Sequence, residues 1–179
     1  MAYKDELLEQ LKDQYGKIVY TYTCHLKMAD RFQNRESYIQ IAQIILSAFS
    51  TGSIVDMYIT KEFSWVCALS SSVLLVLNAY VKAKNFGTLQ SSHVKAANAL
   101  WKIREEYICL MTDLKELEEE KIIERRRHLL EKTAIIYENI PTTDKKSYEE
   151  AQNALKNKEE QFFSNEELNK ILPKHLRNY

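Results

Sequence analysis

The chain has 179 residues, and its 25 Lys and Arg side chains balance its 25 Asp and Glu side chains. This length suits one modest domain, and the zero net charge excludes a protein whose whole surface attracts nucleic acid. Only three glycines and two prolines are available for tight turns, so the composition predicts an all-α chain.

The first predicted element, residues 1–36, is an amphipathic helix. Apolar residues recur at steps of three and four from Leu7 to Ala29, which places them on one helical face. The chain opens with charged residues rather than an apolar core and a small-residue cleavage site, so we expect no secretory signal. This helix is expected to continue directly into the next element.

Two stretches without charged residues follow, Ser37–Val55 and Phe63–Val81, each 19 residues long. A 19-residue helix is about 28 Å long, close to the roughly 30 Å hydrocarbon core of a bilayer. The second stretch is the more apolar, with 14 apolar residues against 11 in the first. They predict a two-helix transmembrane hairpin over residues 37–81, with spans 37–55 and 63–81. Two core helices of a soluble bundle would give the same apolar runs, so that alternative stays open.

Basic residues flank the predicted hairpin on the sides away from its seven-residue connector. The basic residues before the first span are Lys27, Arg31 and Arg35, those after the second are Lys82, Lys84 and Lys95, and the connector has Lys61. By the positive-inside rule, both termini should lie in the cytoplasm.

Polar residues inside the spans form two stripes. On the first helix the stripe is Gln40, Gln43, Ser47 and Ser50, extended by Ile54, and on the second it is Ser64, Ser71 and Asn78. A polar group left unsatisfied in hydrocarbon costs several kcal/mol, so both stripes should face another helix or water. In one interpretation they hold the hairpin, or a dimer, together. In the other, several copies arrange them around an aqueous pore.

The remaining residues are predicted to form the cytoplasmic part. Residues 82–140 read as one long helix whose apolar stripe packs against the N-terminal helix and forms a stalk with it. Pro141 interrupts the pattern, and residues 141–179 form a helical tail in which Ser164 and Glu167 make a capping box.

Residues that could carry chemistry are scattered. The four histidines and three cysteines show no metal-ligand spacing, and neither a phosphate loop nor a nucleophile motif is present. The sequence therefore predicts no catalytic residues, no metal, no cofactor and no enzyme activity.

Three segments resemble the SLATT domains, the two-helix membrane effectors of bacterial conflict systems. They are Tyr20–His25 with Ala29, Ser47–Thr51 and Leu100–Tyr107, and the resemblance covers roughly residues 15–117. It implies an effector that stays silent until phage infection is sensed, then oligomerises and forms a pore or disrupts the inner membrane, aborting viral growth.

The resemblance also implies a separate regulatory partner, from a nucleotide-signal synthase or reverse transcriptase system. Direct nucleic-acid binding has no support in the residues themselves. We expect the stalk to be stabilised by Cys24, His25, Trp101, Arg104 and Tyr107. The competing hypothesis is a membrane-anchored adaptor, in which the hairpin only anchors a cytoplasmic part that recruits a partner.

Overall fold

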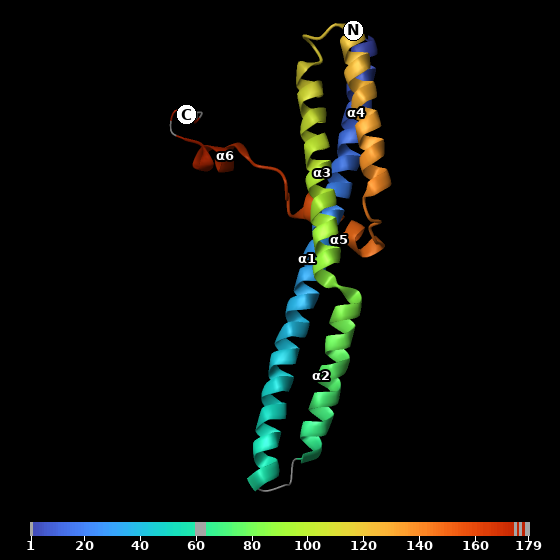
Figure 1. The fold of residues 1–179 in the computed structure, drawn as a ribbon. Coiled ribbons are helices and arrows are strands. Elements are labelled where there is room, and N and C mark those ends of the chain that lie inside the picture. Colours follow the sequence, from blue (N-terminus) through green and yellow to red (C-terminus); the bar gives the residue numbers. More distant parts are fainter. Residues whose placement is uncertain (1, 60–63, 174, 176, 178–179) are drawn as a thin grey trace. The chain divides into compact units, whose positions relative to one another are not determined.

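The computed structural model describes the backbone of residues 2–59, 64–173, 175 and 177, and the side chains of residues 4–52, 65–173, 175 and 177. Six α-helices follow one another in these residues, and none of them lies in a β-strand (Figure 1). The all-α fold class is confirmed for this part of the chain. The helices form two compact units: a bundle unit, Met1–Lys27 with Ala97–Tyr179, and a hairpin unit, Met28–Ala96.

The first helix, α1, is one element of 58 residues, Ala2–Ile59. It has no proline, and its two glycines, Gly16 and Gly52, stand far apart, so nothing in the sequence breaks it. The predicted N-terminal helix and the whole of the first predicted span, residues 37–55, are therefore continuous. Residues up to Lys27 belong to the bundle unit and later ones to the hairpin unit.

The bundle unit is built on the first part of α1, the last part of α3 (Phe86–Asp113) and α4 (Glu119–Asn139), which run side by side (Figure 1). Their apolar faces enclose one core. Its buried members are Leu7, Leu11, Ile18, Leu100, Ile103, Tyr107, Leu110, Leu114, Ile122 and Leu129. The predicted packing of the N-terminal helix against the helix that follows the hairpin is confirmed by this core.

The segment expected as one long helix over residues 82–140 is divided in the structure. α3 ends at Asp113, a turn follows, and α4 begins at Glu119. A straight helix would carry Ile122 away from the core, whereas the turn buries both Leu114 (4% exposed) and Ile122 (0%). Lys4 of α1 also binds this turn, because its ammonium donates to the carbonyl oxygen of Leu117 at 2.9 Å.

The C-terminal tail forms α5 (Lys145–Asn157) and α6 (Asn165–Ile171). Asp144 caps α5 by accepting a hydrogen bond from the Ser147 amide at 2.7 Å. The capping box of Ser164 and Glu167, predicted from the sequence, is confirmed at the start of α6. α5 buries Ala151 and Ala154 in the bundle unit, whereas no residue of α6 is buried.

The hairpin unit consists of the second part of α1, α2 (Ser64–Lys84) and the first turns of α3. Asn85 separates α2 from α3 with a left-handed φ of 48°, a conformation that asparagine adopts more easily than most residues. Its amide donates to the Val81 carbonyl at 2.9 Å, and its side-chain oxygen accepts from the Thr88 amide at 3.3 Å. One residue therefore ends α2 and caps α3.

Candidate functional site

The hairpin unit carries a polar seam between α1 and α2. The amide of Gln43 donates to the side-chain oxygen of Asn78 at 2.8 Å. Further along the two helices, the hydroxyls of Ser50 and Ser70 lie 2.7 Å apart. Because position 43 pairs with 78 and position 50 with 70, the two helices run antiparallel. The seam therefore ties them together at two levels about two turns apart.

Ser70 is the most buried member of this seam, with 6% of its surface exposed. Its hydroxyl donates to the carbonyl oxygen of Cys67 at 3.1 Å, so the hydrogen between Ser50 and Ser70 comes from Ser50. The Ser71 hydroxyl lies 3.5 Å from that of Ser50, at the limit of a hydrogen bond. Small side chains at these positions let the two helices approach closely.

Between residues 38 and 80, most of the outer surface of the hairpin unit is apolar. Its exposed large hydrophobic residues are Tyr38, Ile41, Ile44, Ile45, Phe49, Trp65, Leu69, Val73, Leu75, Val76 and Tyr80. Leu75 is 70% exposed while Ser70 is buried, which reverses the distribution found in water-soluble bundles. An apolar surface around a hydrogen-bonded seam is the arrangement that a bilayer favours.

One helical stretch among the described residues, Trp65–Asp113, contains a window long and apolar enough to cross a membrane. The mean hydropathy of this window is 1.6, and 6% of it is buried. The first predicted span does not meet this criterion within the described residues, because glutamines and serines dilute it and its last side chains, from residue 53 on, are not described. Among the described residues, α2 is thus the one candidate span, and the two-helix transmembrane hairpin stays a prediction.

Most of the other polar residues between positions 40 and 78 gather on one side of the hairpin unit; Ser72, which donates to the Ala68 carbonyl at 2.8 Å, lies elsewhere on α2. Successive residues on a helix turn by about 100°, so Gln40 and Ser47 lie beside the seam rather than in it. On α2, Ser71 and Asn78 are turned away from the centre of the seam by a similar angle. Because the two helices are antiparallel, these residues of α2 and Gln40 and Ser47 of α1 face the same side of the helix pair. We call this surface the polar side; it comprises Gln40, Gln43, Ser47, Thr51, Ser71 and Asn78.

Hydrogen bonding differs among the residues of the polar side. Ser47 and Thr51 donate to carbonyl oxygens four residues earlier, at 2.8 and 3.0 Å, so their donors are satisfied within α1. The amide of Gln40 is exposed and has no hydrogen-bond partner among the described residues. Ile41 and Ala48 lie on the opposite, apolar side of α1.

The sequence stripes are therefore divided in the structure. Gln43, Ser50, Ser71 and Asn78 meet across the seam, whereas Gln40 and Ser47 point away from it. The side chains of Ile54 and Ser64 lie outside the described residues. Sequence analysis missed Ser70. Its spacing of three from Cys67 and four from Leu74 places these three residues on one face of α2, and this could have identified it as a residue of the interface. Whether any of these residues lines a pore stays a prediction.

The five residues expected in the stalk all lie in the bundle unit. Cys24, His25 and Tyr107 are buried, and Trp101 is 45% exposed. The guanidinium of Arg104 lies 5.6 Å from the centre of the Tyr22 ring and donates to Glu105 at 2.6 Å and Gln161 at 3.2 Å.

Burial sets the ionisation of two of these residues. It raises the pKa of the Cys24 thiol, although a hydrogen bond with Ser147 opposes the shift. Burial likewise raises the pKa of Tyr107, against the opposing effect of its hydrogen bond with Thr133. Both side chains are therefore neutral at physiological pH, as packing residues should be.

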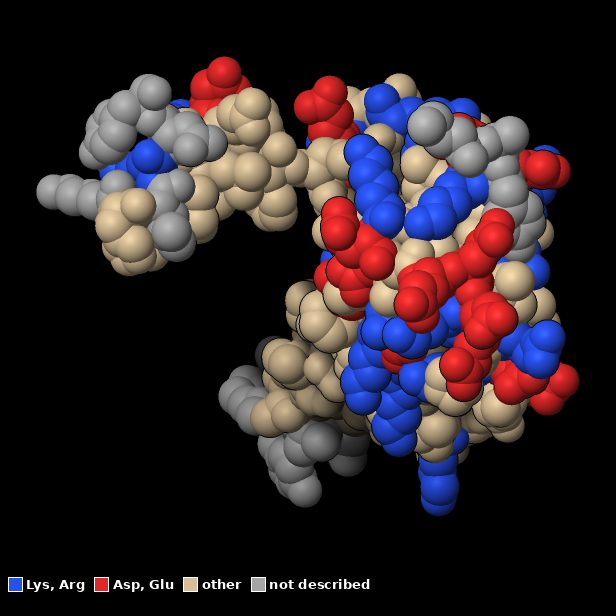
Figure 2. All heavy atoms as spheres, turned by 90° about the horizontal axis from the view of Figure 1, so that it is seen from above, with Lys and Arg blue, Asp and Glu red and all other residues tan. Residues whose placement is uncertain are grey.

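Charges of both signs are mixed on the bundle unit. Figure 2 shows Lys and Arg interleaved with Asp and Glu over the end of the bundle at which α1 begins. Arg125 pairs with Asp113 at 3.3 Å, and Lys132 with Glu106 at 2.9 Å. This face has no continuous basic patch and so lends no support to nucleic-acid binding. No group of His, Cys, Asp and Glu suited to a metal ion occurs among the described residues.

The comparisons with known proteins agree with this arrangement. Residues 7–167 match the family model described as SMODS and SLOG-associating 2TM effector domain family 4. No curated protein and no solved structure matches the chain significantly. The matched residues include most of the bundle unit and the whole hairpin unit. Because the match covers most of the chain, the resemblance to SLATT domains is confirmed: the protein belongs to SLATT family 4, whose members are two-transmembrane effector domains associated with SMODS and SLOG proteins.

Proposed function

We propose that this protein is a membrane effector of a bacterial anti-phage system that acts by oligomerising and opening a pore in the inner membrane. The hairpin unit crosses the bilayer twice, and both termini lie in the cytoplasm. Several copies turn their polar sides toward a common axis, while their apolar surfaces face lipid. The chain acts without catalysis, and ion leakage itself is the toxic event.

The observation that carries this proposal is the polar side of the hairpin unit. Gln40 has an exposed amide without a hydrogen-bond partner among the described residues, and Ser47 and Thr51 lie near it. An amide exposed to acyl chains costs several kcal/mol, so this side is stable only against water or another helix. One hairpin cannot enclose water, and a ring of hairpins can.

The seam has a separate role in this proposal. The Gln43–Asn78 and Ser50–Ser70 bonds consume polar groups that would otherwise face lipid. They hold α1 and α2 as one wall segment, each bond contributing about 0.6–2 kcal/mol in a membrane. In this proposal Ser50 and Ser70 only hold the hairpin together and Gln40, Ser47 and Thr51 only face the pore, whereas Gln43 and Asn78 lie at the border of the two surfaces.

Control of the pore falls to the bundle unit and a separate regulatory partner. The family is named for its association with SMODS and SLOG proteins, and we propose that such a system, or a reverse transcriptase system, supplies the trigger. α1 and α3 each contribute residues to both units, so the chain offers a direct route for a change in bundle packing to reach the hairpin. A partner that binds one of two packings shifts the equilibrium between closed and open rings.

The test compares two double variants on opposite sides of α1. Gln40→Leu with Ser47→Leu removes polar groups from the polar side, and Ile41→Leu with Ala48→Leu is the matched control on the apolar side. We expect the first to lose ion leakage from vesicles and depolarisation in expressing cells, and the control to keep both. Equal leakage from the two variants, or a wild-type protein that inserts and never conducts, contradicts the proposal.

The adaptor hypothesis makes a different prediction in the same cells. Replacing residues 37–81 with an unrelated two-helix anchor keeps the bundle unit at the membrane but removes the polar side. A pore-forming effector loses all protection against phage after this exchange. Retained protection would show that the hairpin is an anchor and that the cytoplasmic part acts by recruiting a partner.

A further inference from the structure

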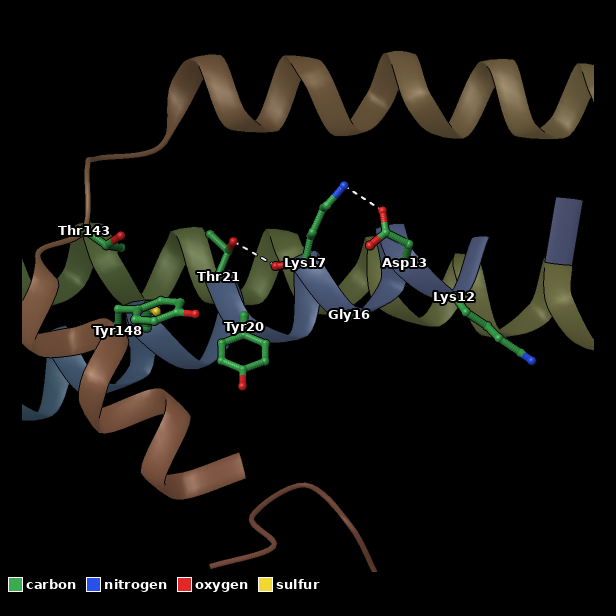
Figure 3. Close-up of a pocket in the computed structure, with 9 residues that line it drawn as sticks. Lys12, Asp13, Gly16, Lys17, Tyr20, Thr21, Thr143 and Tyr148 are labelled. Atoms are coloured by element: carbon green, nitrogen blue, oxygen red, sulfur yellow. Dashed lines mark hydrogen bonds and ion pairs between the residues drawn. The ribbon is translucent and has the colours of Figure 1, made fainter. Parts of the chain in front are cut away.

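A cavity in the bundle unit lies along α1 where the start of α5 meets it. Its volume is about 490 Å³, within the range of small-molecule sites. Figure 3 shows that most of the labelled residues come from successive turns of α1, while Tyr148 comes from α5 and Thr143 from the segment before it. The residues that line it are Lys12, Asp13, Gly16, Lys17, Tyr20, Thr21, Cys24, Thr143 and Tyr148.

Gly16, a lining residue on α1, is not explained by packing. Glycine weakens a helix, and its φ here is not positive, so the backbone does not require it. A Cβ atom built at this position would meet no heavy atom within 4 Å apart from its chain neighbours and the adjoining backbone of α1. The missing side chain therefore leaves open space beside the α1 backbone, as is common where a ligand approaches a main chain closely.

The aromatic residues offer a surface for a flat ring. The rings of Tyr20 and Tyr148 are stacked, with centroids 5.7 Å apart and planes inclined by 26°. Tyr148 remains 51% exposed, although it packs on α1. A planar ligand can extend this stack, because aromatic faces bind bases and similar rings without requiring a particular sequence of hydrogen bonds.

The cavity offers two ammonium groups to an anion. Lys12 and Lys17 line it together with Asp13, and the neighbouring Glu9 balances the charge of the second lysine. Lys17 pairs with Asp13 at 2.6 Å and Lys12 with Glu9 at 2.8 Å, and all four side chains are more than half exposed. Such exposed pairs are weak, so a phosphate with close to two negative charges can replace a carboxylate as the partner of either ammonium.

We propose that this cavity binds a phosphorylated ring compound of mononucleotide size. The ring stacks on the Tyr20–Tyr148 pair, the phosphate binds Lys17, and the body of the ligand lies over Gly16. Since the site joins α1 to α5, an occupied cavity holds α5 against the bundle. The proposal concerns binding and stands independently of whether the hairpin forms a pore.

The experiment uses the full-length protein in non-ionic detergent micelles. The probes are AMP, GMP, CMP and UMP, with adenosine and inorganic phosphate as the two halves of a ligand, and binding is followed by calorimetry and ligand-detected NMR. We expect at least one mononucleotide to bind, and each half to bind at least tenfold more weakly than the whole.

Three variants and one control locate the site. Gly16→Leu fills the cavity while it improves helix propensity, and Lys17→Gln and Tyr148→Leu remove the charge and the ring. Each should weaken binding at least tenfold with an unchanged circular dichroism spectrum. The control is Lys121→Gln, which replaces an exposed lysine of α4 that pairs with Glu118 at 3.1 Å. It should change the affinity for the mononucleotide less than twofold.

Three results would overturn the proposal. The first is that no mononucleotide binds at millimolar concentration. The second is that folded Gly16→Leu binds as the wild type does. The third is that inorganic phosphate binds as tightly as the mononucleotides, because the ring would then contribute nothing.

Discussion

Neighbouring polar side chains of one stripe have different surroundings in the structure. Gln43 is bonded to Asn78 across the seam, whereas Gln40, three residues earlier, is exposed. Periodicity correctly placed both on the polar half of α1, but the angular difference of about 60° between them decides which one meets α2. A stripe read from sequence is wider than an interface between two helices.

Gly16 provides a test of stability at the residue scale. Gly16→Ala should raise the free energy of unfolding by about 0.5–1 kcal/mol, because alanine favours the helix and its methyl group meets open space. Urea unfolding in micelles, followed by circular dichroism, measures the change. Gly16→Pro is the control and should unfold part of α1. A destabilised alanine variant would show that the space beside Gly16 is occupied in the folded protein.

The raised pKa values of Cys24 and Tyr107 predict how stability depends on pH. Both groups keep their protons in the folded state at pH values where the unfolded chain loses them. Their contribution is complete below the unfolded pKa values and declines as the pH rises through about 9 and above.

Urea unfolding between pH 7 and 11 should therefore show stability falling on the alkaline side. Tyr107→Phe should flatten the part of the fall that belongs to the phenol, although it loses the hydrogen bond with Thr133. A pH profile that is identical in wild type and Tyr107→Phe would show that this tyrosine ionises equally in both states.

At the scale of elements, the sequence predicted helices better than it predicted their ends. Pro141 and the box of Ser164 and Glu167 are local signals, and the breaks they indicate are present. The break after Asp113 has neither proline nor glycine, so no local signal marked it. The break exists because Ile122 and Leu129 reach the core only if the chain turns back. The free energy gained by burying them depends on core residues that are far away in the sequence.

The pairing of α1 with α2 can be tested by a disulfide. In a protein whose three cysteines are replaced by alanine, Ser50→Cys with Ser70→Cys should form an intramolecular disulfide under mild oxidation, since the native hydroxyls lie 2.7 Å apart. Ala48→Cys with Ser70→Cys should not, because position 48 lies about 160° around α1 from position 50. Electrophoresis without reductant distinguishes the two, and efficient cross-linking of the control pair would contradict the seam.

For the whole molecule, the main question is which solvent surrounds the hairpin unit. Its exposed apolar residues and buried serine have opposite meanings in water and in lipid. Family membership agrees with lipid, because the family is described by two transmembrane segments. The full-length chain should therefore stay in the membrane pellet after an alkaline carbonate wash and dissolve in mild detergent.

A substitution on the outer surface makes this test sharper. Leu75 is 70% exposed, so Leu75→Arg would be nearly neutral on a water-soluble protein. In a membrane it should cost about 2.5–3.5 kcal/mol of insertion energy and move protein out of the pellet. Trp101→Arg in the bundle unit is the control and should leave the fractionation unchanged. Release of wild-type protein by carbonate would instead make the two uncharged stretches core helices.

The sequence alone determined the helical class, the two uncharged stretches, the polar stripes and the family, because all of these are written in composition, spacing and local motifs. The tertiary structure decided the return of α4 onto the bundle, the pairing of Gln43 with Asn78, the burial of Ser70 and the cavity over Gly16. Periodicity states which face of a helix is polar or apolar. It does not state which distant side chain will meet that face, since that depends on the packing of all the helices at once.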